Sequence, residues 1–196
     1  MKPSQTVDLD AWSESQIQSK LWLCGELELL QNRFAADLTV WMAPGWYGVL
    51  ALLLLVRSRL KIGIVRSFDI DPRATEIANA VNAAWSAQNG RFRALTADID
   101  TVEFQHPQLY HSPKPDVLIN TACEHLGKRT WFERIPKGTL VVLQSTDLVD
   151  PDHVARVSSA GELTRQLPIS EVLFEGSLRV DRPGNPHHRF MTIGFA

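Results

Sequence analysis

Apolar and polar residues alternate along this chain in short blocks of two kinds. Runs typical of strands cover 38–42, 62–68, 91–95, 116–120, 139–145, 171–180 and 189–195. Helical patterns lie between them, over 49–60, 72–85 and, more weakly, 151–165. Near the N-terminus, Leu23, Leu27, Leu30 and Phe34 recur at helical spacing. They predict a further helix over about 13–35, which Ser13 begins as an N-cap.

The order of these blocks predicts an α/β fold. Strands that alternate with helices indicate a mostly parallel sheet. The link 181–188 between the last two strands is too short for a parallel crossover, so this pair should be an antiparallel hairpin. We therefore expect a seven-stranded, mostly parallel sheet with a C-terminal antiparallel hairpin and helices on both faces. Residues 1–34 form an N-terminal tail and helix, a candidate lid, and 35–196 form the main domain.

Composition narrows the classes of function. The 196 residues are enough for one domain. A net charge of −2 gives no basic field to attract nucleic acid, and the apolar run 49–56 is too short to span a bilayer. The first residues lack the apolar core of a signal peptide, and two cysteines provide no disulfide framework. These features predict a cytoplasmic protein with a small-molecule substrate, without nucleic-acid or membrane partners, and leave open whether it forms a homodimer.

The segment 38–71 carries the clearest functional pattern. A strand leads into the turn Ala43–Gly48, a helix follows, and the second strand ends on Asp69. This is the order of a nucleotide-binding βαβ unit, in which an acid at the tip of the second strand accepts hydrogen bonds from ribose hydroxyls. The spacing G-x-G-x-x-G, which admits a pyrophosphate, is absent. The pattern therefore favours an adenosine-type cofactor without phosphate.

Seven strands ending in a hairpin, with polar residues at three strand tips, resemble the class I S-adenosylmethionine (SAM)-dependent methyltransferases over about 35–196. The resemblance implies SAM as the cofactor. It implies that the turn 44–48 wraps the methionine part, that Asp69 binds the ribose and that Asp98 lies near the adenine amino group. The implied cofactor-binding residues are Pro44, Gly45, Trp46, Tyr47, Gly48, Asp69, Ile70, Asp98, Asn120 and Thr121.

The turn departs from the family's acidic, glycine-rich loop, because it has two glycines with Trp46 and Tyr47 between them. Aromatic faces attract a sulfonium cation. The alternative is a tight turn with a partly buried aromatic pair. The alternative to a ribose contact is that Asp69 is a solvent-exposed strand terminator. The alternative to an adenine contact is that Asp98 is an acid of a surface loop.

The expected catalytic residues are Glu124 and His125, which follow the fourth strand and can act as base or acid. The alternative is a capping box, because Thr121 and Glu124 have the spacing T-x-x-E. Cys123 is better explained as a small buried hydrophobe than as a nucleophile. The histidines show no metal-binding spacing, so no metal site is predicted, although Glu124 beside His125 leaves one open.

These observations predict a SAM-dependent transferase that methylates a small molecule, in small-molecule biosynthesis. One alternative is an enzyme that transfers or cyclises the aminocarboxypropyl arm of SAM and releases methylthioadenosine. A second is a non-catalytic binding subunit that retains the fold.

Overall fold

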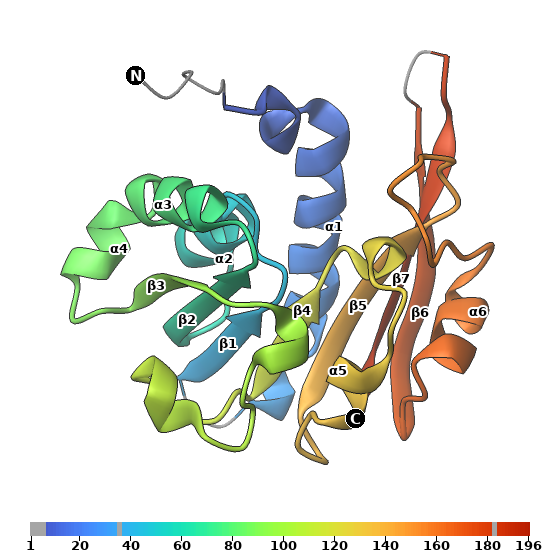
Figure 1. The fold of residues 1–196 in the computed structure, drawn as a ribbon. Helices are drawn as coiled ribbons and strands as arrows, with labels where there is room; N and C mark the ends of the chain where they lie inside the picture. Colours follow the sequence, from blue (N-terminus) through green and yellow to red (C-terminus); the bar gives the residue numbers. More distant parts are fainter. Residues whose placement is uncertain (1–6, 35–36, 182–183) are drawn as a thin grey trace.

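The computed structural model describes residues 7–34, 37–181 and 184–196. Within them, seven strands form one sheet in the order β3-β2-β1-β4-β5-β7-β6 (Figure 1). Strands β1 to β5 are parallel, and β7 pairs antiparallel with both β5 and β6. The strands are β1 (Leu38–Met42), β2 (Ile62–Asp69), β3 (Phe92–Thr96), β4 (Val117–Asn120), β5 (Leu140–Thr146), β6 (Glu171–Val180) and β7 (His187–Phe195). The predicted sheet and its C-terminal hairpin are confirmed.

The helices are α1 (Glu14–Leu29), α2 (Val49–Arg57), α3 (Pro72–Val81), α4 (Ala83–Ala87), α5 (Thr130–Glu133) and α6 (Ala160–Gln166). Short 3₁₀ turns are η1 (Leu9–Trp12), η2 (Gln31–Arg33), η3 (Ile99–Thr101), η4 (Pro107–Tyr110) and η5 (Cys123–His125). Ser13 is the N-cap of α1, as predicted, and its side chain accepts a hydrogen bond from the Gln16 N–H. In the described part of the chain, no helix is both long and apolar enough to cross a bilayer.

All four predicted helices differ from the structure in extent. The helix expected over 13–35 ends at Leu29 and is followed by η2, and the helix expected over 49–60 ends at Arg57. The helix expected over 72–85 is divided at Asn82, whose buried amide donates to the carbonyls of Ala78 and Gly48 at 3.0 and 3.1 Å. The helix expected over 151–165 is wrong in its first half, because α6 begins only after Ser159, its N-cap. The preceding residues instead form a loop that packs on η5, where the Ala155 N–H donates to the Glu124 carbonyl at 2.8 Å.

Side chains of the sheet alternate between two hydrophobic clusters, one on each face. Helices α1, α2 and α3 cover one face, with Leu23, Leu54 and Ala78 in its cluster. Helices α5 and α6 cover the other, where Trp131 and Leu163 are buried. Figure 1 shows α1 running along the sheet behind β4 and β5. The helices on both faces are thus as predicted.

Helix α1 belongs to the core of the domain. Leu23 and Leu27 are fully buried in the cluster that contains α2 and the central strands. Ser19 also donates to the buried Gln144 side chain of β5 at 3.1 Å. The lid role of this helix stays a prediction, and any opening that lifts α1 would expose these leucines to water.

We predict that Leu23→Ala lowers the free energy of unfolding by about 2–5 kcal/mol, because it leaves a cavity in the core. Leu29→Ala is the matched control on the same helix, since Leu29 is 77% exposed. It should change that free energy by no more than about 0.5 kcal/mol. Urea melts of the two variants measure the difference. Equal stabilities would show that α1 does not belong to the core.

Candidate functional site

The turn after β1 lies against the end of β2. The Gly45 N–H donates to the Phe68 carbonyl at 2.7 Å. A Cβ atom at Gly45 would collide with the Ser67 hydroxyl, so the close approach requires glycine. The turn then bends through positive φ angles at Trp46 (46°) and Gly48 (69°) into α2. The peptide bond between Ala43 and Pro44 is cis.

Asp69, at the tip of β2, links this turn to the start of α3. Its carboxylate accepts hydrogen bonds from the Trp46 N–H at 2.8 Å and from the Asp71 N–H at 3.0 Å. Burial raises the pKa of Asp69, and these backbone hydrogen bonds partly oppose the rise. Asp71 is the N-cap of α3, with Pro72 in the first turn, as the sequence predicts. Each Asp69 oxygen has a second lone pair that remains able to accept a hydrogen bond.

A cavity of about 420 Å³ opens at the carboxyl ends of β1 to β4. That volume lies within the range of about 300–1,000 Å³ usual for small-molecule sites. The cavity is lined by Pro44 after β1, residues 68–70 at the end of β2, 97–100 after β3, 125–128 after β4, and Trp131. In an open α/β sheet this is the edge at which ligands bind.

The walls of the cavity combine apolar surfaces with acids at two strand ends. Phe68, Ile99 and Trp131 are buried side chains along it. Asp98 caps η3 by accepting from the Asp100 N–H at 2.9 Å. With Asp69, it gives the cavity two carboxylates on neighbouring strands, beside apolar surface of the kind that a flat aromatic ring can contact.

Tyr47 and Trp46 are absent from the cavity lining described above. Tyr47 is buried and stacks between Trp12 and Trp46, with ring centroids 5.6 and 5.2 Å apart. The Lys20 ammonium lies 6.0 Å from the Trp46 ring centroid. Burial lowers the pKa of Lys20 to about 8, so it remains mainly protonated at pH 7. The aromatic pair therefore packs against the N-terminal segment, and a cation already lies over Trp46.

Glu124 is buried beneath the end of β4. One carboxylate oxygen accepts from Arg189 of β7 at 3.2 Å, and the other has no hydrogen-bond partner among the described residues. The N-cap of η5 is Ala122 and no side chain caps it, so the capping-box alternative for Thr121 and Glu124 is wrong. Arg189 also donates to the Thr121 carbonyl at 3.1 Å, which fixes this strand end to the C-terminal hairpin.

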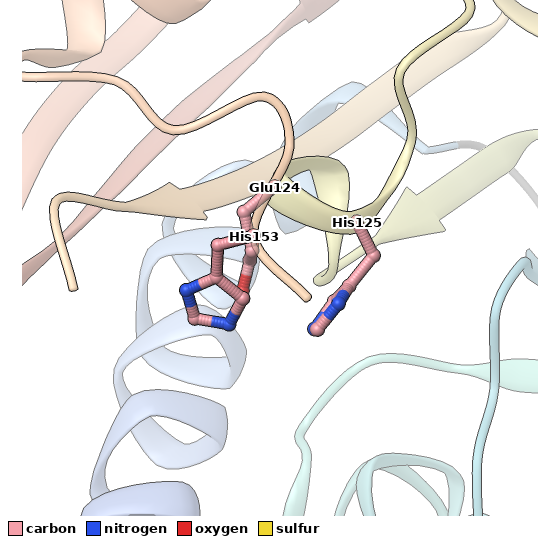
Figure 2. A group of neighbouring side chains, drawn as sticks. All are labelled: Glu124, His125 and His153. Carbon is pink, nitrogen blue, oxygen red and sulfur yellow. The ribbon is translucent and has the colours of Figure 1, made fainter. Parts of the chain in front are cut away.

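Two histidines lie beside Glu124. His125 follows it in η5, and His153 comes from the loop after β5; their rings meet edge to face, with centroids 4.7 Å apart. Figure 2 shows the three side chains directed to the same side of the turn. His125 also lines the cavity. Burial raises the pKa of the neighbouring Cys123 well above its usual value, which keeps it a thiol and argues against a nucleophile.

The fold of this chain is similar to that of several solved structures. The chain superimposes on magnesium protoporphyrin IX methyltransferase from Synechocystis, with S-adenosylhomocysteine bound, at a TM-score of 0.64 and 11% identity; the match covers 97% of this chain and 89% of that one. The YcgJ protein of Bacillus subtilis gives 0.63 at 10% identity, over 88% and 97%. An rRNA methylase from Streptococcus thermophilus gives 0.53 at 12% identity, over 94% and 98%. No protein-family model matches the sequence. No curated protein matches it either.

The chain has the class I SAM-dependent methyltransferase fold. Of the residues that the sequence predicted for cofactor binding, Pro44, Asp69, Ile70 and Asp98 meet at the cavity of this methyltransferase fold. Gly45, Trp46, Tyr47 and Gly48 shape the turn behind it. Asn120 ends β4 and Thr121 follows it, outside the cavity lining, and the Asn120 side chain accepts from the Ala122 N–H at 2.9 Å. The roles of all ten residues remain predictions.

Sequence reasoning missed three residues at this candidate site. Trp131 lines the cavity, His153 lies beside His125, and Arg189 pairs with Glu124. Arg189 is 65 positions from its partner, and no local spacing connects the two. Of the three residues, only Trp131 had a signal in the sequence. It forms an apolar pair with Phe132 in a stretch of charged residues after the fourth strand.

We predict that Gly45→Ala lowers the free energy of unfolding by about 1–3 kcal/mol, because the new methyl group overpacks against Ser67. Adding Ser67→Ala removes the colliding hydroxyl, so the double variant should recover part of that loss. Thermal melts of the single and double variants form the test. Additive effects of the two substitutions would contradict the close contact.

Proposed function

We propose that this protein is a SAM-dependent methyltransferase that acts on a small-molecule acceptor. The observation that carries the proposal is the cavity at the carboxyl ends of β1 to β4, with Asp69 at the tip of β2. The fold counterpart from Synechocystis holds S-adenosylhomocysteine. These features support SAM as the ligand of this cavity.

The cavity chemistry suits the adenosine half of SAM. In the proposed complex the Asp69 carboxylate accepts from the ribose hydroxyls with the lone pairs that the backbone leaves free. The adenine ring lies against Phe68 and Ile99, and Asp98 accepts from its amino group. The binding free energy then comes from buried ring surface and from charge-assisted hydrogen bonds.

The methionine half would extend toward the turn after β1, past Pro44. The close packing of Gly45 against Ser67 and the hydrogen bond from Trp46 to Asp69 give this turn a fixed shape. Trp46 and Tyr47 then act mainly by holding the turn, because their rings stack on the N-terminal segment. A direct cation–π contact with the sulfonium is less favoured, because Lys20 already lies over the Trp46 ring.

Methyl transfer is an in-line displacement, so catalysis consists chiefly of positioning and of removing a proton from the acceptor. His125 borders the cavity and is exposed, which suits a group that meets the acceptor. Glu124 lies behind it, oriented by Arg189. We assign the proton-removing role to this pair.

The net charge of −2 favours a small molecule over a nucleic acid as the acceptor. The aminocarboxypropyl-transfer alternative stays open, because the turn that would contact that arm departs from the family pattern. The non-catalytic alternative predicts that SAM neither binds nor reacts.

We predict that the purified protein binds SAM and that Asp69→Ala weakens binding at least about tenfold, because a charge-assisted hydrogen bond contributes about 1.5–3 kcal/mol. Asp71→Ser is the control, since serine keeps an N-cap for α3 and this position is not part of the cavity. Calorimetric titrations measure both affinities, and melts confirm that both variants fold. Unchanged affinity in Asp69→Ala would rule out the ribose contact.

The by-product of turnover distinguishes the two reaction classes. We expect incubation with SAM and an accepted substrate to yield S-adenosylhomocysteine, because attack at the methyl carbon leaves the rest of SAM intact. Chromatography of the reaction identifies the product. Methylthioadenosine in its place would show that the aminocarboxypropyl arm reacts and would replace the methyltransferase assignment.

A further inference from the structure

Glu124, His125 and His153 have the geometry of a metal-binding triad. Each offers one ligand atom, and these atoms all lie within 4.8 Å of one another. Metal bonds of about 2.0–2.2 Å place ligand atoms about 3–4 Å apart, so inward movements of about 1 Å would close the triad on an ion. The side chains come from η5 and from the loop after β5 (Figure 2). A hydrogen bond from the Ala155 N–H to the Glu124 carbonyl at 2.8 Å joins these two segments.

The hydrogen bonds of the two imidazoles support this reading. His125 Nδ1 lies 3.1 Å from the Asp152 carbonyl, and His153 Nδ1 lies 2.9 Å from the Leu148 carbonyl. A carbonyl can only accept, so each Nδ1 carries a proton, and in the neutral ring Nε2 then presents a lone pair. Histidines that bind metals in proteins are oriented by a hydrogen bond of this kind to the other ring nitrogen.

The carboxylate supplies a second, independent observation. Glu124 is 1% exposed, and its Oε2 is buried without a hydrogen-bond partner in the part of the chain that the structure describes. Arg189 holds the other oxygen at 3.2 Å, which orients the carboxylate. A buried, unpaired carboxylate oxygen is costly, and a cation beside it would remove that cost.

We propose that Glu124, His125 and His153 bind a divalent first-row transition ion at the edge of the cavity. Two imidazoles and one carboxylate suit zinc, iron, cobalt or manganese better than the all-oxygen ligand sets that magnesium and calcium prefer. Three protein ligands leave coordination positions open for a small molecule. The sequence predicted no metal site because the third ligand comes from a separate loop.

The role of the ion rests on the proposed function. The open positions beside His125 would bind an oxygen of the acceptor, which makes a hydroxyl compound the substrate class. Binding to the ion lowers the pKa of the hydroxyl, so its proton passes to water. The oxygen then forms a bond to the methyl carbon of SAM, the C–S bond breaks, and its electron pair stays on sulfur. In this scheme Glu124 and His125 act as ligands, and the ion together with a water molecule replaces them in the removal of the proton.

The test is a zinc titration of the full chain after dialysis against a chelator, followed by calorimetry. We expect one ion per chain, and at least about a tenfold loss of affinity in His125→Ala and in His153→Ala. His106→Ala is the matched control, because this exposed histidine lies in the loop before η4 and should leave the affinity unchanged. Cobalt substitution adds a visible absorption band that reports nitrogen and oxygen ligands and should disappear in both ligand variants.

Affinities within about twofold across the wild type and the three variants would overturn the site, given the losses expected from removing a ligand. Should an alanine variant fail to melt cooperatively, His153→Gln gives the same comparison with a side chain of similar size. SAM titrations of the chelator-treated protein separate the two proposals. Binding of SAM without specific zinc binding overturns only the metal site, whereas zinc binding without SAM binding supports the site and overturns the methyltransferase assignment.

Discussion

The hydrogen bond from the Trp46 N–H to the Asp69 carboxylate holds the turn after β1 against the end of β2, and the cavity depends on it. Pro44 and Asp69 contribute to the lining from the two sides of this junction. The hydrogen bond from the Gly45 N–H to the Phe68 carbonyl at 2.7 Å also holds the turn there, and the lack of a Cβ at Gly45 permits this close approach to Ser67. Asp69 is therefore a structural residue before it binds anything, and a ligand would meet a carboxylate that the backbone has already oriented.

Local patterns predicted the central strands well because β1, β4 and β5 are buried along their whole length, and their apolar runs reflect that burial. In β6, at the edge of the sheet, only Val180 is fully buried, and polar residues interrupt the run. The errors have non-local causes. Asn82 divides the helix expected over 72–85 because its amide reaches the Gly48 carbonyl of another element. Residues before Ser159 form a loop because they pack on η5. No periodicity within either segment carries that information.

The same distinction applies to the candidate site. Asp69, Asp98 and His125 could be predicted at one edge because the carboxyl ends of parallel strands meet there. What Glu124 contacts could not be predicted, since Arg189 reaches it from the C-terminal hairpin. The spacing of Thr121 and Glu124 matched a capping box. In the structure, however, the Glu124 carboxylate contacts Arg189 of the distant β7, and no side chain caps η5.

The burial of Glu124 is the strongest physical constraint at this site. Transferring a carboxylate from water to the interior costs several kcal/mol, and a pair with a single arginine offsets that cost only when the geometry is good and the other lone pairs are satisfied. Here the ion pair is a single contact of 3.2 Å, and Oε2 has no partner within the described residues. The two imidazoles lie near enough to share a cation with it, since the three ligand atoms are within 4.8 Å of one another. A bound divalent ion would satisfy the carboxylate and hold the loop after β5 to η5, which would couple the stability of this edge of the sheet to the chemistry of the cavity.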